Sequence, residues 1–268
     1  MAIFDCFQYF NEDHIADLRF NILNEHVDFF VVVESTVNHQ GQTRKLHFDK
    51  NKYKKFQSKI VYIEVDDTPD NIKKPHTGGE SLVEQHQRNS IMKGLNKSQD
   101  NDLIILSDVD EIPDLNKLKV FDKNKYAVFS QKMFMYKLNL LNLNENNWHG
   151  SKICLKKNLK SPQWLRNLKF KKYPFWRIDK QKNLQIIKDG GWHFAYLQSP
   201  ENISKKIKSF AHGEFNRDNI AEEENIRFKI ENNKDIFDRG YKIKKIEVNE
   251  TFPKYILENK EKFKDWIV

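Results

Sequence analysis

Short apolar runs alternate with polar or amphipathic stretches along the first half of the chain. The runs at residues 3–7, 28–34, 59–66 and 103–106 are rich in β-branched and aromatic residues, which predicts buried strands. Between the first two runs, Asn11-Glu12-Asp13 offers a helix cap, and apolar residues follow at helical spacing. Strand, helix and strand in this order predict a βαβ unit, and therefore an α/β fold with a mainly parallel central sheet.

The second half of the chain predicts more strands and then helices. Strands are expected at 126–130 and 133–138, joined by a tight connection, and at 183–187. Helices are expected at 80–96 and, after the cap at Ser199, over much of the C-terminal part. The irregular segment 142–172 predicts long loops beside a binding cleft, and the pattern around Trp176 favours a core position for that side chain. We expect one domain over 1–268, with a sheet core over about 1–198 and a helical part over about 199–268.

The acidic stretch after the run at 103–106 carries the most specific chemistry. Asp108, Asp110, Glu111 and Asp114 follow a buried strand, and Pro113 stops that strand from continuing. Ligands of open α/β sheets bind at the carboxyl ends of the strands. Two aspartates one residue apart at such an edge suit a hard divalent cation that bridges a diphosphate, although an acidic turn alone is common in proteins.

A further strand end and a predicted helix offer partners for this edge. Glu34 and Ser35 end the run at 28–34, and parallel strands bring their carboxyl ends together. Arg88 lies on the helix predicted at 80–96, and its guanidinium suits a carboxylate such as Glu34 or a phosphate. An ordinary solvated helix face explains the same pattern equally well.

The stretch Asp189-Gly190-Gly191-Trp192-His193 is the second one with chemical character. Paired glycines allow close backbone approach, and His193 offers an imidazole that would complete a metal shell begun by carboxylates. A histidine between aromatic residues is more often a packed side chain, so the acidic edge is what favours a ligand role.

Composition narrows the choice of partners. The net charge of +8 admits nucleic acid, an anionic membrane or an anionic substrate, and a solvated basic face is favoured over nucleic-acid binding. Cys6 and Cys154 lack the spacing of a zinc site or a disulfide framework and are expected to be buried thiols. The chain starts without a basic leader and has no apolar stretch of about 20 residues, which predicts a cytoplasmic protein.

Five motifs together resemble glycosyltransferase family 17, whose typical member is the β-1,4-mannosyl-glycoprotein β-1,4-N-acetylglucosaminyltransferase. They are Phe4-Asp5-Cys6-Phe7, Val33-Glu34-Ser35, Gln87-Arg88-Asn89, Ser107-Asp108-Val109-Asp110-Glu111-Ile112-Pro113 and Gly191-Trp192-His193-Phe194. The resemblance spans nearly the whole chain. It implies a GT-A-type Rossmann-like fold, an inverting reaction, a UDP-sugar donor, UDP-GlcNAc in the first place, and Mn²⁺ or Mg²⁺.

The resemblance also assigns expected roles to residues. Asp108 would face the ribose or the metal, Asp110 would bind the metal, and His193 is a further candidate metal ligand. The expected nucleotide-sugar side consists of Glu34, Ser35, Arg88, Asp108 and Trp192. Inversion needs a carboxylate that deprotonates the acceptor hydroxyl, and Glu214 is the first candidate, with Asp189 and Glu111 as alternatives.

The expected partners are a nucleotide-sugar donor and a glycan or lipid-linked glycan acceptor, with no nucleic acid. Lacking an anchor and a secretory signal, the chain reads as a soluble bacterial or viral member, and its basic face would allow contact with an anionic membrane. Two rival functions stay open. One is a non-catalytic nucleotide-sugar or glycan-binding protein, and the other is a metal-dependent phosphohydrolase or nucleotidyltransferase.

Overall fold

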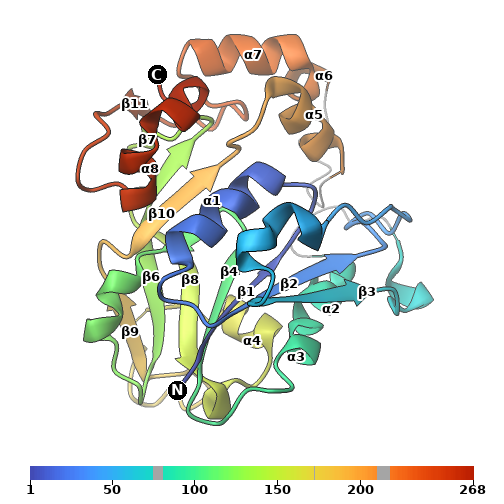
Figure 1. Ribbon diagram of the computed structural model, residues 1–268, viewed down its shortest axis with the longest axis vertical. Helices are drawn as coiled ribbons and strands as arrows, with labels where there is room; N and C mark the ends of the chain where they lie inside the picture. The colour runs from blue at the N-terminus through green and yellow to red at the C-terminus, as the bar shows by residue number, and fades with distance from the viewer. Residues whose placement is uncertain (75–80, 172, 210–217) are drawn as a thin grey trace.

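A large mixed sheet runs through the molecule and carries helices on both faces (Figure 1). The computed structural model describes residues 1–74, 81–171, 173–209 and 218–268. Its strands are β1 (Ile3–Gln8), β2 (Phe29–Ser35), β3 (Ile60–Val65), β4 (Leu103–Asp108), β5 (Glu111–Pro113), β6 (Tyr126–Met135), β7 (Leu140–Asn142), β8 (Trp148–Leu155), β9 (Leu184–Ile187), β10 (Gly191–Ala195) and β11 (Ile243–Lys245). Its α-helices are α1 (Asp13–Leu23), α2 (Leu82–Asn89), α3 (Ile91–Gly94), α4 (Pro162–Asn167), α5 (Pro200–Ser209), α6 (Asp218–Ala221), α7 (Glu223–Glu231) and α8 (Lys254–Glu258).

The sheet joins a parallel half to a mixed half. Strands β4, β1, β2 and β3 are neighbours in that order and are all parallel, as the βαβ pattern predicts. Strand β8 runs antiparallel between β4 and β6, while β9 and β10 pair in parallel with β6. The mixed α/β class and the mainly parallel centre of the sheet are therefore confirmed.

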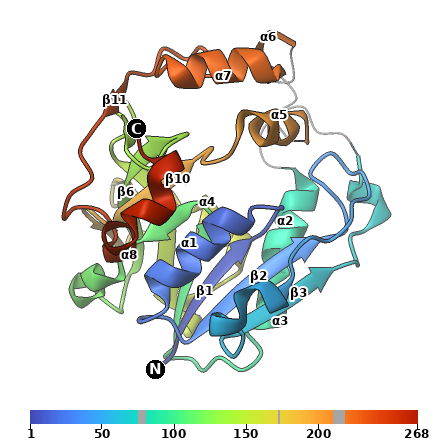
Figure 2. The ribbon, with the colours of Figure 1, turned by 45° about the horizontal axis from the view of Figure 1, so that its top comes forward.

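Alternation along the strands creates two apolar layers. In β1, Phe4 and Cys6 pack with α3 and α4, whereas Phe7 packs with α1 and α8 on the other face. Figure 2 shows α1 in front of β1 and β2, with α2 and α3 on the far side. A third cluster joins α5 and α7 to the end of β6. As expected, Cys6 and Cys154 are buried free thiols.

Three predictions about local structure are wrong. A single strand, β6, covers the strand predicted at 126–130 and the first part of the one predicted at 133–138, because a bulge between Val128 and Ser130 bends it without ending it. The segment 142–172 holds β8 and α4 instead of long loops alone, since residues 150–155 of β8 are buried between β4 and β6. The helix predicted at 80–96 is divided at Ser90, whose hydroxyl donates to the carbonyl of His86.

The C-terminal part is mainly helical, but β11 adds a short strand that pairs with β7. Trp176 is 66% exposed, so its predicted core position is wrong. No helix in the described ranges is long and apolar enough to cross a membrane.

Gly191 fixes the pairing of β10 with β5, and its substitution tests that pairing. Its φ is +134°, and an added Cβ would lie 2.3 Å from the carbonyl oxygen of Ile112. We expect Gly191→Ala to lower the free energy of unfolding by about 2–4 kcal/mol in urea titrations, because a backbone clash adds to the conformational strain. Gly240→Ala is the matched control, since Gly240 has φ +80° but nothing within 4 Å of an added Cβ. An equal loss in both variants would contradict this explanation.

Candidate active site

A small cavity opens at the carboxyl edge of the parallel strands. Its volume is about 150 Å³, and the acids Asp108 and Asp110 line it together with residues of the β1–α1 loop. We call it the Asp110 cavity; its lining residues are Gln8, Tyr9, Phe10, Glu12, His39, Glu84, Gln87, Asp108, Val109, Asp110 and Lys206. Small-molecule sites commonly measure about 300–1,000 Å³, so a nucleotide sugar would extend beyond this cavity.

A buried arginine holds the acidic turn in place beneath the cavity. Arg19 of α1 is fully buried, and its Nε and Nη2 donate to the carboxylate of Asp5 on β1 at 2.7 and 2.5 Å. Its Nη1 donates to the carbonyls of Asp108, Val109 and Glu111 at 3.2, 3.3 and 2.6 Å. One guanidinium therefore ties a helix, a strand and the whole turn together.

A second arginine satisfies two of the acids in that turn. Arg166 of α4 donates to Asp108 at 2.5 Å and to both oxygens of Glu111 at 3.1 and 3.0 Å. The fully buried Glu111 also accepts from the indole of Trp148 at 2.8 Å and from the backbone N–H of Asp108 at 3.0 Å. Both Glu111 oxygens are thus engaged by protein donors, which suits a residue that shapes the turn.

Asp110 differs from Asp108 in its electrostatic environment. Burial raises the pKa of Asp108, but Arg166 and Arg88 outweigh it and lower that pKa. Burial also raises the pKa of Asp110, where His193 is the dominant opposing group and the net shift is downward. Both carboxylates are therefore ionised at neutral pH, but only Asp108 is neutralised by arginines.

His193 lies next to Asp110 and completes this part of the site. Its Nε2 is 3.6 Å from Oδ1 of Asp110, and the ring of Trp148 packs at 4.9 Å between centroids. Burial lowers the pKa of His193, but the neighbouring Asp110 outweighs that and raises it. Its Nδ1 is buried without a hydrogen-bond partner in the described structure.

The Asp110–His193 pair could supply two of the ligands of a divalent cation. Atoms 3.6 Å apart can both bind one cation with bonds of about 2.1 Å. The described part of the chain contains no group of three or more metal-ligating acids, histidines or cysteines. The two side chains thus offer a partial shell, and the remaining ligands would have to come from the substrate and water.

Lys206 and Glu12 bring an ion pair to the same cavity, and sequence reasoning missed both. Lys206 of α5 donates to Glu12 at 2.6 Å, and both side chains are largely buried. Burial lowers the pKa of Lys206, but Glu12 and Asp110 outweigh it and raise that pKa. Burial raises the pKa of Glu12 despite the lysine. Glu12 was visible in the sequence as a possible helix cap, but nothing local showed that residue 206 would meet it.

Of the residues predicted for the nucleotide side, Arg88 lies close to Asp108, whereas Glu34 and Ser35 are engaged by other partners. Glu34 is fully buried and accepts from Arg44 at 2.7 Å, from two backbone N–H groups of the 36–49 loop and from Tyr62 at 3.0 Å. The Ser35 hydroxyl accepts from the N–H of Val37. Arg88 pairs with Glu84 and Gln163 and lies 3.7 Å from Asp108, not against Glu34.

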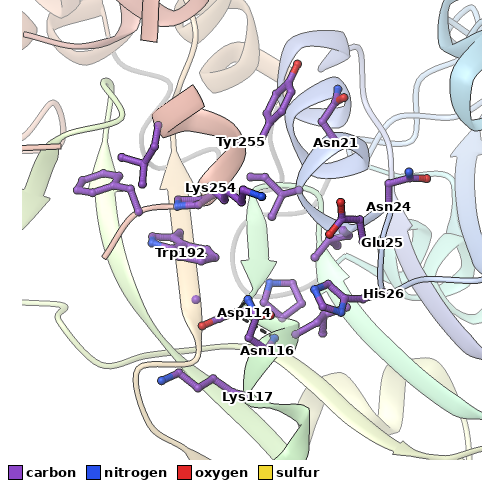
Figure 3. Close-up of a pocket in the computed structure, with 18 of the residues that line it drawn as sticks. Asn21, Asn24, Glu25, His26, Asp114, Asn116, Lys117, Trp192, Lys254 and Tyr255 are labelled. Atoms are coloured by element: carbon purple, nitrogen blue, oxygen red, sulfur yellow. Dashed lines mark hydrogen bonds between the residues drawn. The ribbon is translucent and has the colours of Figure 1, made fainter. Parts of the chain in front are cut away.

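A second, larger cavity lies on the other side of β10. Its volume is about 740 Å³, and Trp192 and Asp189 line it together with the end of α1 and the start of α8. Figure 3 shows Trp192 beside Lys254 on one wall and Asn24, Glu25 and His26 on the other. We call it the Trp192 cavity. The structure therefore separates Trp192 and Asp189 from the Asp110 cavity.

Glu214, the first candidate for the base, lies outside the described residues. Of the alternatives, Glu111 accepts hydrogen bonds from Trp148 and Arg166. Asp189 lines the Trp192 cavity. The catalytic roles of all three remain predictions.

The comparison with protein families gives one clear match. The family model described as Glycosyltransferase family 17 matches residues 1–267, essentially the whole chain. This confirms the resemblance that the five motifs indicate. A search of curated proteins finds no match.

The role of Arg19 is testable by removing one or both partners of its buried pair. Arg19→Met leaves Asp5 as an unpaired buried charge, and we expect it to cost about 3–5 kcal/mol of unfolding free energy. Adding Asp5→Leu removes that charge, so the double variant should lose less than the single one. The exposed pair Arg227–Glu223 is the control, and Arg227→Met should cost less than about 1 kcal/mol. A double variant as unstable as the sum of the two single ones would contradict this assignment. Chemical denaturation of Arg19→Met, Asp5→Leu, the double variant and Arg227→Met gives the four values.

Proposed function

Because the chain belongs to glycosyltransferase family 17, we propose that this glycosyltransferase is a metal-dependent inverting enzyme. It transfers N-acetylglucosamine from UDP-GlcNAc to a hydroxyl of a glycan or lipid-linked glycan. The proposal includes a GT-A-type arrangement of the sheet, with the donor at the carboxyl edge of β1, β2 and β4. Family membership supports the glycosyltransferase class, the motif resemblance suggests UDP-GlcNAc and inversion, and the site supports a cation at Asp110.

The observation that carries the proposal is the position of Asp110. This ionised carboxylate lines a cavity at the carboxyl edge of parallel strands, where α/β sheets bind nucleotides. It lies beside His193 and is not engaged by an arginine in the described structure. Asp110 is therefore the carboxylate best prepared to accept a cation that arrives with a diphosphate.

The residues around Asp110 divide the work of binding the donor. Asp110 and His193 would hold a divalent cation, which would neutralise the charge of the leaving diphosphate. Lys206 brings a further positive charge to the cavity wall. Arg166 orients the carboxylate of Asp108 at 2.5 Å. The oriented carboxylate would accept a hydrogen bond from a sugar hydroxyl such as that of the ribose.

The base is assigned to Glu214, with Glu12 as a second candidate. An inverting displacement needs a carboxylate opposite the leaving group. Glu12 lines the Asp110 cavity, and its raised pKa makes it a stronger base than an ordinary glutamate. Its contact with Lys206 at 2.6 Å favours a binding role for it, so Glu214 remains our first choice.

Donor binding should depend on both metal and Asp110. At a UDP-GlcNAc concentration about 100 times Kd, with Mn²⁺, we expect about 2.7 kcal/mol of stabilisation in thermal unfolding experiments. Chelation of the metal should abolish this stabilisation, and Asp110→Ala should do the same because it removes a metal ligand. Asp122→Ala is the control, since Asp122 is a partly exposed acid that pairs with Lys125 away from the cavity.

The same experiment separates the rival functions. Donor binding without slow donor hydrolysis or transfer would support a non-catalytic binding protein. Cleavage within the diphosphate, detected as release of UMP, would support a phosphohydrolase. If no nucleotide sugar stabilises the protein, or if Asp110→Ala binds donor like the wild type, the proposal is wrong.

Glutamine variants of Glu214 and Glu12 should distinguish the two candidates for the base. Removing the base should lower kcat by about 10²–10⁴-fold while the donor Kd stays unchanged. We expect this result for Glu214→Gln. Glu12→Gln should mainly raise the donor Kd, because the ion pair with Glu12 positions the Lys206 ammonium in the cavity wall. Normal turnover of Glu214→Gln would eliminate that residue, and a selective loss of kcat in Glu12→Gln would assign the base to Glu12. Steady-state kinetics and calorimetric titration with UDP-GlcNAc give both quantities.

A further inference from the structure

A tip of exposed apolar side chains stands on the segment between α4 and β9. Phe175 is 81% exposed, Trp176 is 66% exposed and Ile178 is 91% exposed. We call these three residues the apolar tip. Single exposed apolar side chains are common on protein surfaces, but three large ones within four positions mark an interaction site.

The apolar tip has a defined local structure. The N–H of Arg177 donates to the carbonyl of Pro174 at 3.1 Å, which closes a turn beneath the three side chains. The rings of Phe175 and Trp176 meet edge to face at 5.1 Å. Lys182 donates to the carbonyl of Phe175 and ties the turn to the residues before β9. The turn therefore holds the apolar side chains outward. Their exposure to water is unfavourable, and a partner that covered them would remove that free-energy cost.

Basic residues surround the apolar tip. Between Leu168 and Asn183 the sequence contains six lysines or arginines and a single acid, Asp179. Arg177 and Lys180 share Asp179 at 2.7 and 3.1 Å, whereas Lys169 and Lys171 are exposed on the approach to the tip. The segment thus combines a net positive charge with aromatic side chains. The core of a protein–protein interface is instead depleted of charged residues.

We propose that the apolar tip inserts into the headgroup region of an anionic phospholipid bilayer. Tryptophan and phenylalanine favour the interface between water and lipid, and lysines beside them are attracted to anionic headgroups. A second copy of this chain is a poorer partner, because a symmetric contact would place two such basic segments against each other. The charge around the tip therefore selects a membrane surface.

The location of the tip sets how the protein would face the membrane. Residues 168–183 lead into β9, whose first residue pairs with Tyr126 at the start of β6. Strand β6 runs parallel to β4, because both are antiparallel to β8, so this is the edge of the sheet opposite Asp108. A protein bound through the tip would keep the Asp110 cavity towards the aqueous phase.

Flotation of the full chain with lipid vesicles tests the proposal. The vesicles are phosphatidylcholine alone or an equal mixture of phosphatidylcholine and phosphatidylglycerol. We expect the wild type to float with the anionic vesicles only. The triple variant Phe175→Ser, Trp176→Ser, Ile178→Ser should bind at least about tenfold more weakly, since the apolar anchor is lost. Phe228→Ser is the matched control, because Phe228 is 52% exposed on α7 and has Lys234 beside its ring.

A second measurement separates insertion from electrostatic adsorption. Acyl chains that carry bromine close to the headgroup should quench more fluorescence in the wild type than in Trp176→Phe, because only an indole inserted at that boundary meets the label. Absence of flotation with anionic vesicles, equal flotation of the triple variant, or an equal loss in Phe228→Ser would each overturn the proposal. Wild-type dimers that the triple variant cannot form, without vesicle binding, would assign the tip to self-association instead. UDP-GlcNAc binding should be the same in the triple variant, so this test fails or succeeds independently of the proposed function.

Discussion

The buried guanidinium of Arg19 is the interaction on which the candidate site depends. A turn that carries three acids exposes backbone carbonyls to a dry interior, and those carbonyls need donors. Arg19 supplies them for Asp108, Val109 and Glu111, and its other two donor positions are fixed by Asp5 at 2.7 and 2.5 Å. The acidic turn therefore has one position relative to α1 and β1. Without that constraint, neighbouring carboxylates would repel each other and separate.

The second arginine of the site, Arg166, makes two similar acids chemically different. It contacts Asp108 and Glu111 but not Asp110, so the motif of two aspartates is asymmetric. Asp108 and Glu111 are held by protein donors, while Asp110 meets His193 at 3.6 Å. A motif written as two equal aspartates thus contains one carboxylate that is oriented by the protein and one that is prepared for a cation. This division is a property of the fold, because Arg166 comes from a helix that is 58 residues away in sequence.

The sequence predicts the parts of this arrangement that depend on local patterns. Apolar runs identify β1, β2, β3 and β4, and parallel pairing places Asp108 at the strand ends. Local patterns do not predict Arg19, Arg166 or Lys206, because each reaches the site from a distant element. Arg19 nevertheless carried a signal, since a charged residue among the apolar positions of a helix needs a buried partner. Strand β8 was missed because it is flanked by polar loops. The contacts of Trp148 with Glu111 and His193 were missed for the same reason.

The alternation of side chains along β10 limits how a single ligand can use the predicted residues. His193 points towards Asp110 and Trp148, whereas its neighbour Trp192 packs in the core on the other face and donates to the carbonyl of Thr251 at 3.0 Å. The strand is paired on both sides, with β5 and β6, so no ligand passes through it. A sugar in contact with Trp192 would therefore belong to a different ligand, or to a different part of one, than the group bound by Asp110. Two residues that are adjacent in one sequence motif thus lie on opposite sides of β10, Trp192 in the wall of one cavity and His193 beside an acid that lines the other, and a mutation of one should not be interpreted as a probe of the other.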